Sequence, residues 1–235
     1  SLNSAWIVFE EALEIAFKNN LFAKSGLVSI KGLAQVKQKM DDFGAALSLF
    51  EKALIICEKN KIPEIPERLA ILKDAAELQD YVGNLDKAEN LYLEAISILE
   101  KYEQTKEEHY TEISGALASV YQRLGKYTKS ELYYKKSVDL LKNSNHFSPK
   151  EYAYLLNGWG NLYHNLSKYD EAEKLYSESL ELRKNIYGNE SVDYAQSLNN
   201  LALLYDDIGK PAEAEKMYKT VLKIWEKEYG KQSPI

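Results

Sequence analysis

The side chains with the clearest chemical potential in this sequence are carboxamides placed at regular intervals. Asn157 and Asn199 lie 42 residues apart, and Asn161 follows Asn157 at the spacing of one helical turn. A carboxamide offers both a hydrogen-bond donor and an acceptor, so an ordered row can pair with the backbone of an extended peptide. Any one of these asparagines, taken alone, is better explained as a solvated side chain. The prediction of a peptide-binding site therefore rests on the ordered set.

Residues suited to catalysis or metal binding do not form a recognisable pattern. The histidines His109, His146 and His164 are widely separated, and neither HExxH nor another metal-binding spacing occurs. Asp206 and Asp207 are adjacent on a helix, so they point in different directions. No Ser-His-Asp set can be assembled from local motifs. We therefore predict that the chain is not an enzyme and has no cofactor and no metal site.

Composition narrows the class of protein further. The chain has 235 residues, 45% of them hydrophobic, which is enough to bury a core. Its formal net charge of −6 argues against nonspecific binding to nucleic acid. The longest apolar runs have five residues, whereas a transmembrane helix needs about 20, so no membrane span is predicted. Cys57 is the only cysteine, which fits a small buried group in a reducing, cytoplasmic setting.

An internal repeat of 42 residues predicts the elements that carry the polar side chains. Five copies keep one register without a gap. Each copy has a first stripe at i, i+3, i+4 and i+7, and a second stripe at i, i+4 and i+8, both of which indicate helices. In the fourth copy these positions are Leu156, Trp159, Gly160 and Tyr163, followed by Ala172, Tyr176 and Leu180.

A short breaker separates the two stripes of every copy. The breaker positions are Asp41, Gly83, Gly125, Ser167 and Gly209. Glycine is typical of a helix C-terminus, so each copy is expected to be a pair of antiparallel helices. Small residues in both helices permit close packing, and an aromatic side chain fills the seam between neighbouring pairs. The seam aromatics are Phe50, Tyr92, Tyr134, Tyr176 and Tyr218.

These positions follow the pattern W-x2-L-G-x2-Y…A-x3-F, and the chain resembles the tetratricopeptide repeat family over nearly its whole length. The 42-residue period and the segments 187–190 and 197–202 are similar to the long subtype found in kinesin light chains. The usual period is about 34 residues, and the extra ones are expected to lengthen the second helix and its loop. The resemblance weakens toward the N-terminus, where Lys37 and Gln79 replace tyrosine. It implies an all-α fold, a right-handed α-solenoid of stacked antiparallel helix pairs.

The resemblance also predicts how the chain is organised. We expect one array over residues 1–235, with repeats at 27–60, 69–102, 111–144, 153–186 and 195–229. Residues 1–20 match a second helix without its first, because Ala5 and Phe9 correspond to Ala46 and Phe50. The last helix is too apolar for a free cap. The chain is therefore interpreted as a piece of a longer protein, or as one whose ends meet a partner or a second copy.

In the tetratricopeptide family, partners bind to the first helices, away from the packing stripe. By register, the candidate ligand-binding residues are Lys31, Gln35, Lys73, Glu77, Tyr154, Asn157, Asn161, His164, Asn199 and Asn200. Some members hold a peptide's terminal carboxylate with lysine and asparagine. Such a clamp is not expected here, because Gln35 replaces the asparagine and Asp74 and Glu77 would repel a carboxylate.

Two functions follow from this resemblance. The first is a non-enzymatic scaffold that binds a peptide segment of a partner protein in a preformed concave groove. The alternative is a sensor or regulatory peptide-receptor module of a larger signalling protein, similar to bacterial quorum-sensing receptors. A third hypothesis is that the array regulates an enzyme domain elsewhere in its chain. Self-association through open solenoid ends is also expected to be available.

Overall fold

The fold is described from a computed structural model that covers residues 23–59, 65–101, 107–145 and 147–230. Within those ranges there are ten helices and no strand. The predicted helix at residues 1–20 lies outside them. Contacts divide the chain into two compact units, residues 1–103 and residues 104–235. The single array over residues 1–235 and the repeat bounds stay predictions.

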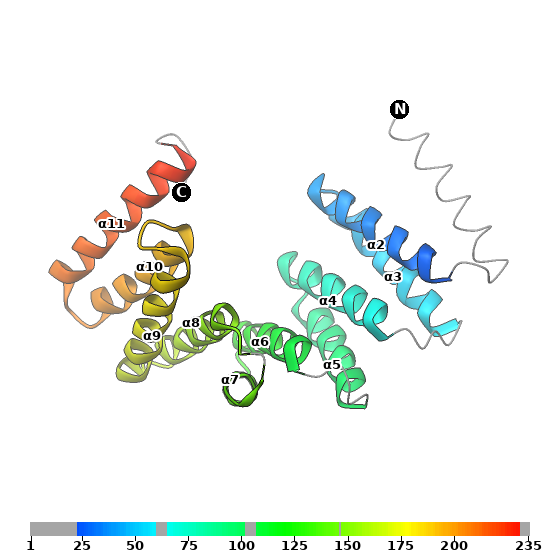
Figure 1. Cartoon of the computed structure of the whole chain (residues 1–235), viewed down its shortest axis with the longest axis horizontal. Coiled ribbons are helices and arrows are strands. Elements are labelled where there is room, and N and C mark those ends of the chain that lie inside the picture. The colour runs from blue at the N-terminus through cyan, green and yellow to red at the C-terminus, as the bar shows by residue number, and fades with distance from the viewer. Residues whose placement is uncertain (1–22, 60–64, 102–106, 146, 231–235) are drawn as a thin grey trace. The chain divides into compact units, whose positions relative to one another are not determined.

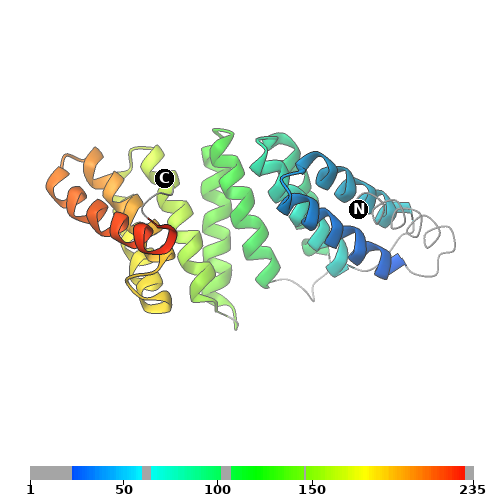
Figure 2. The ribbon, with the colours of Figure 1, turned by 90° about the horizontal axis from the view of Figure 1, so that it is seen from above.

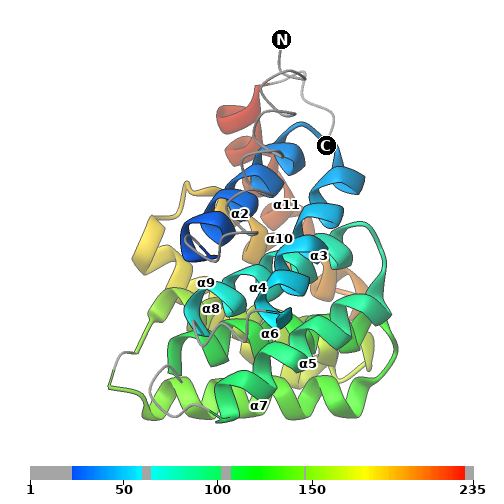
Figure 3. The ribbon, with the colours of Figure 1, turned by 90° about the vertical axis from the view of Figure 1, so that its right-hand side faces the viewer.

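Each unit consists of helix pairs. The first unit contains α2 (Ala23–Lys39), α3 (Phe43–Lys59), α4 (Ile65–Tyr81) and α5 (Leu85–Lys101). The second contains α6 (Glu107–Arg123), α7 (Tyr127–Asn143), α8 (Pro149–Asn165), α9 (Tyr169–Tyr187), α10 (Val192–Asp207) and α11 (Pro211–Tyr229). Figures 1 and 2 show the two helices of a pair lying side by side, and Figure 3 shows the first unit from another side. This arrangement confirms the all-α fold of stacked helix pairs.

The first helices of neighbouring pairs also contact one another within a unit. Helix α2 contacts α4 in the first unit, and α8 contacts both α6 and α10 in the second. Each second helix packs against the first helix of the next pair, as α3 does against α4 and α9 against α10. Each unit therefore has one face made only of first helices, which is where the candidate ligand-binding residues were expected.

All five predicted breakers end a first helix in the left-handed conformation. Their φ values are 59° at Asp41, 84° at Gly83, 70° at Gly125, 56° at Ser167 and 77° at Gly209. The residue after each breaker donates its backbone N–H to the carbonyl five residues earlier, as Lys168 does to Tyr163 at 2.9 Å. This bond is the signature of a Schellman cap, which satisfies carbonyls that the helix leaves open.

The copies that lack tyrosine before the breaker compensate at the residue that caps it. In the second unit, Lys126, Lys168 and Lys210 lie over the rings of Tyr121, Tyr163 and Tyr205 at 5.8, 5.0 and 4.9 Å. In the first unit the equivalent pairs are Lys37 with Asp42, an ion pair of 3.1 Å, and Gln79 with Asn84, a hydrogen bond of 2.8 Å. The two members of each pair therefore change together.

The expectation that the extra residues lengthen only the second helix is wrong. Helix α8 begins at Pro149, four residues before the predicted start of its repeat, because Ser148 caps it by accepting the Glu151 N–H at 3.3 Å. Helix α10 begins at Val192 in the same way, after Ser191. The first helix has 17 residues in α8 and the second has 19 in α9, so both helices share the extra length.

The seam aromatics form the core between pairs. Phe50, Tyr92, Tyr134 and Tyr176 are all buried, whereas Tyr218 is half-buried because no described helix follows α11 to cover it. Gly160 allows this packing in the fourth pair, since a Cβ there would lie 2.7 Å from the Tyr176 ring. The large seam side chain therefore needs a very small residue opposite it.

Candidate functional site

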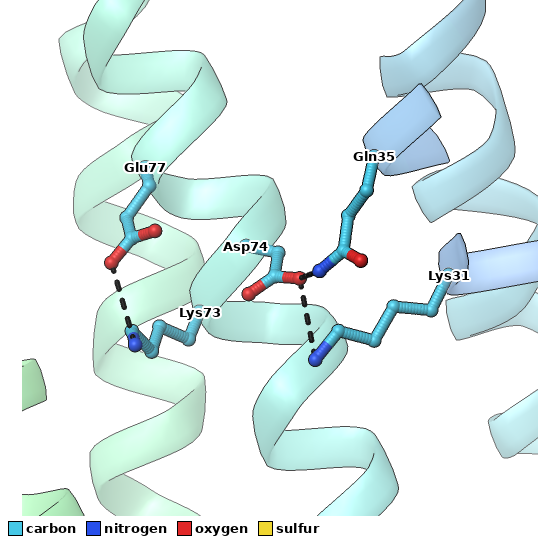
Figure 4. A network of polar contacts seen from close by, with 5 residues as sticks. All are labelled: Lys31, Gln35, Lys73, Asp74 and Glu77. Carbon is cyan, nitrogen blue, oxygen red and sulfur yellow. Dashed lines mark hydrogen bonds and ion pairs between the residues drawn. The ribbon is translucent and has the colours of Figure 1, made fainter. Parts of the chain in front are cut away.

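The first-helix face of the first unit carries a network of charged and amide side chains, drawn in Figure 4. Asp74 Oδ2 on α4 lies 3.3 Å from Lys31 Nζ and accepts a hydrogen bond of 2.8 Å from Gln35 Nε2, both on α2. Lys73 pairs with Glu77 one turn away at 3.7 Å. The four candidate residues predicted in this unit therefore lie near one another, and both lysines already pair with an acidic side chain.

Two depressions lie on either side of this network. The first, of about 280 Å³, is lined by Leu27, Val28, Lys31, Pro66, Glu67, Ala70 and Ile71. The second, of about 550 Å³, is lined by Gln35, Gln38, Lys39, Asp41, Phe43 and Tyr81. Tyr81 is largely exposed, and its ring centroid lies 5.2 Å from that of Phe43. The contact of Lys31 and Gln35 with Asp74 separates an apolar hollow from an aromatic one.

In the second unit, three of the predicted asparagines meet across α8 and α10. Asn200 Nδ2 donates to Asn157 Oδ1 at 3.1 Å and to Asn161 Oδ1 at 3.2 Å. The side-chain oxygen of Asn161 also accepts a hydrogen bond of 2.7 Å from the Tyr176 hydroxyl, which comes from α9. We call Asn157, Asn161 and Asn200 the amide cluster. All three are partly exposed, so the cluster is accessible from the first-helix face.

The other candidates in the second unit lie around this cluster without joining it. His164 Nε2 lies 2.7 Å from Asp207 Oδ2, which links α8 to α10 one turn beyond Asn161. Tyr154 exposes 55% of its surface. Asn199 makes no side-chain hydrogen bond to any described residue, so the structure brings together Asn157 and Asn200 rather than Asn157 and its repeat equivalent, Asn199.

A buried arginine beside the cluster was missed by reasoning on first helices alone. Arg183 belongs to α9 and is only 6% exposed. Its Nη1 donates to the backbone oxygen of Asp193 at 2.9 Å and to Gln196 Oε1 at 3.2 Å, both on α10. Burial lowers the pKa of this guanidinium, an effect that the neighbouring Asp193 opposes. Among the described residues no carboxylate lies within ion-pair distance of it, so its charge is only partly compensated.

Two further features bear on the chemistry open to this chain. The described residues contain no group of three or more His, Cys, Asp or Glu side chains that could hold a metal ion. None of the helices that the structure describes is long and apolar enough to cross a membrane. The polar side chains that gather on the first-helix faces are amides, lysines and carboxylates, which are suited to binding through hydrogen bonds and ion pairs.

Comparison with sequence families identifies the repeat. A family model described as tetratricopeptide repeat matches residues 27–101 and 151–227, and a second model with the same description matches residues 111–142. The chain therefore belongs to the tetratricopeptide repeat family. Proteins of this family bind proteins or peptides and are generally not enzymes. No curated protein matches the sequence.

Solved structures with the same fold include kinesin-light-chain-like proteins. BtubC (BKLC) from P. vanneervenii is 24% identical, with a TM-score of 0.78 over 99% of this chain and 92% of that one. A Podosopora anserina protein described as a kinesin light chain with nearly identical TPR-like repeats is 21% identical, with a TM-score of 0.71 over 86% and 95%. The apo quorum sensor NprR from B. thuringiensis is 18% identical, with a TM-score of 0.72 over 94% and 60%. At these identities the likeness shows the fold alone.

Proposed function

We propose that this chain is a non-enzymatic interaction module that binds an extended peptide segment of a partner protein on its first-helix faces. The principal site is the face of α8 and α10 in the second unit. The observation that carries this proposal is the amide cluster, because it places three carboxamides from two helices within hydrogen-bonding distance on an accessible surface. A rigid helical platform of this kind needs little ordering when a peptide binds.

Arg183 adds a preference for an acidic peptide. A buried guanidinium without a carboxylate partner has lost hydration that no ion pair replaces. A glutamate or aspartate of the ligand would supply the missing charge, and arginine is well suited to bind a carboxylate with two parallel hydrogen bonds. We therefore expect the peptide to place an acidic side chain near Gln196, beside the amide cluster.

The test begins with a displayed library of random 12-residue peptides selected on the immobilised chain. The tightest selected peptide is then measured by fluorescence anisotropy against the chain and against Asn157→Ala/Asn161→Ala/Asn200→Ala. We expect the triple variant to bind at least about tenfold more weakly, since each lost hydrogen bond is worth about 1 kcal/mol. The matched control is Asn185→Ala/Asn189→Ala, which removes two exposed asparagines of the same unit.

The proposal would be overturned by either of two results. One is a selection that enriches no peptide. The other is a selected peptide that binds the triple variant as tightly as the unchanged chain, with circular dichroism showing that both are folded. If the peptide binds but carries no acidic residue, the preference assigned to Arg183 is wrong and the amide site remains.

A second function is favoured by the similarity in fold to NprR, whose structure is that of a quorum sensor. We propose as the alternative that the chain is the sensor module of a larger signalling protein. It would then bind a free signalling peptide in place of a segment of a folded partner. A DNA-binding or other effector domain in the full-length protein would favour the sensor, whereas additional repeats would favour the scaffold.

We also propose a cytoplasmic location and self-association through α11. The lone cysteine, Cys57, is buried and reduced, which fits a reducing compartment. Helix α11 exposes Leu222 and Tyr229, two large hydrophobic side chains. Sedimentation velocity on Leu222→Ser/Tyr229→Ser tests the second point: the unchanged chain should form larger species as its concentration rises, and the variant should remain a monomer.

A further inference from the structure

The carboxamides of the amide cluster have a definite orientation. The oxygens of Asn157 and Asn161 both face inward, where Asn200 Nδ2 donates to them at 3.1 and 3.2 Å. The amino groups of Asn157 and Asn161 donate to no described residue. On the α8 side, therefore, the acceptors of the cluster are used within the protein and the donors remain.

Tyr176 holds this orientation from below. Its hydroxyl donates to Asn161 Oδ1 at 2.7 Å, and its side chain is only 1% exposed. Burial raises the pKa of this hydroxyl, so it remains a hydrogen donor at physiological pH. The ring cannot shift easily, because a Cβ at Gly160 would already approach it to 2.7 Å. Rotating the Asn161 carboxamide would place its amino group against that of Asn200, leaving two donors facing each other.

We infer that Tyr176 is a positioning residue for the amide cluster and that α8 therefore reads only hydrogen-bond acceptors of the ligand. This inference rests on the proposed peptide-binding function and specifies what the site recognises. The ligand groups that fit are backbone carbonyl oxygens. The open oxygen of Asn200, on α10, is left to accept from a backbone N–H.

The spacing of the donors predicts how the peptide lies. Asn157 and Asn161 are four residues apart, which is about 6 Å along a helix axis. Carbonyl groups of alternate residues in an extended peptide lie about 6.6 Å apart and point to the same side. The two spacings agree closely enough for two alternate carbonyls to meet the two amino groups. We therefore place the extended peptide along α8, with the carbonyl groups of residues i and i+2 on Asn157 and Asn161.

The orientation of the cluster is tested without any ligand. In ¹⁵N NMR of the intact chain, assigned from single-site asparagine variants, the side-chain amide protons of Asn200 should exchange with water about five- to tenfold more slowly than those of Asn157 and Asn161. The reverse order, with Asn157 and Asn161 protected and Asn200 exchanging fast, would overturn the inference. Equal exchange of all three would also overturn it, because no carboxamide would then be held.

The role of Tyr176 is tested with Tyr176→Phe, which keeps the ring and removes only the hydroxyl. The probe is the tightest peptide selected from the random library. We expect Tyr176→Phe to weaken its binding about three- to tenfold and to remove the difference in exchange between Asn161 and Asn200. The control is Tyr134→Phe, the same seam position one repeat earlier, which does not contact the amide cluster and should leave both readouts unchanged.

The outcomes separate this inference from the proposed function. If Tyr176→Phe changes neither binding nor exchange while the triple asparagine variant loses the peptide, the positioning role is wrong and the peptide site stands. If the triple variant keeps the peptide, the proposed function fails, and the ligand-free exchange experiment alone decides the orientation. A drop in thermal stability of Tyr176→Phe without loss of the Asn161 protection would make the hydroxyl a structural group only, which also contradicts the inference.

Discussion

At the scale of single residues, the most informative positions are the two breakers that are not glycine. Asp41 and Ser167 occupy the left-handed region, with φ values of 59° and 56°. That conformation costs a residue with a Cβ roughly 1–2 kcal/mol, and aspartate tolerates it better than most. The equivalent positions in the other copies are glycine, so these two copies retain a local strain that the others avoid.

Ser167→Gly should therefore stabilise the chain. We expect the free energy of unfolding to rise by about 0.5–1 kcal/mol, because the relief of left-handed strain exceeds the extra flexibility that glycine gives the unfolded chain. Urea denaturation followed by circular dichroism measures the change. Gly125→Ala is the reciprocal control and should lower the free energy of unfolding by about 1 kcal/mol. A stabilising Gly125→Ala would contradict the assigned cap conformation.

At the scale of helices, the residue before each breaker and the residue that caps it act as a unit. The first copy uses Lys37 with Asp42, and the third to fifth use tyrosine with lysine. Either pairing links the end of a first helix to the start of the next. An exchange of only one member leaves two cations or an uncompensated anion at the turn.

A double-mutant cycle tests this coupling in the first copy. Asp42→Lys alone should destabilise the chain, because it places a second cation beside Lys37. Adding Lys37→Tyr recreates the tyrosine–lysine pair of the later copies and should recover about 0.5–1 kcal/mol of the loss, the usual size of an exposed cation–π contact. The coupling energy is obtained from urea denaturation of the four proteins. Additive effects of the two substitutions would show that the pair does not act together.

Two tyrosines of the second unit predict how helix packing responds to alkaline pH. Tyr163 and Tyr205 donate their hydroxyls to Glu131 and Glu173 at 2.7 and 2.6 Å. The pKa of Tyr163 is raised to about 12, mainly by burial and then by Glu131, and that of Tyr205 to about 12, mainly by the hydrogen bond to Glu173. Raised pKa values of an acid mean that the folded state favours the protonated hydroxyl.

The stability that these hydroxyls contribute is present below the unfolded pKa of about 10 and is lost as the pH rises to about 12. The melting temperature should therefore fall more steeply above pH 10 in the unchanged chain than in Tyr163→Phe/Tyr205→Phe, where these hydroxyls are gone. Differential scanning calorimetry between pH 8 and pH 11.5 provides the comparison. Parallel curves for the two proteins would mean that these hydroxyls carry no net stability.

At the scale of the whole molecule, stability follows from contacts between neighbouring pairs. In a repeat array each pair contacts only those next to it, so a defect should be felt locally. The proposed site lies within the second unit, on α8, α9 and α10. The first unit carries a different first-helix face, with Lys31, Gln35 and Asp74 in one network.

A cavity in the first unit should therefore leave the proposed site intact. Phe50 is completely buried in α3, and Phe50→Ala should cost about 3–5 kcal/mol locally. Hydrogen exchange measured by mass spectrometry should show faster exchange in α2–α5 and unchanged protection in α8–α11. Binding of the library peptide should also be unchanged. Loss of protection throughout both units would show that the chain unfolds as a single cooperative body.

The sequence by itself determined the helices, their breaks and the core. An apolar stripe with helical periodicity leaves a segment few other ways to bury its side chains, and glycine at three of five breakers marks where each first helix ends. The same register predicted which helix faces would carry the polar candidates. The seam tyrosines, however, were interpreted only as core, and their periodicity carries no sign that the Tyr176 hydroxyl reaches Asn161.

Only the tertiary structure decided which polar groups meet. Repeat register pairs Asn157 with Asn199, but the distance between α8 and α10 and the rotation of each helix bring Asn200 to it instead. Arg183 was missed because it belongs to a second helix, and its long side chain crosses to α10. A hydrogen bond depends on separations of a few tenths of an ångström, whereas a periodic pattern locates a side chain only to a face of its helix.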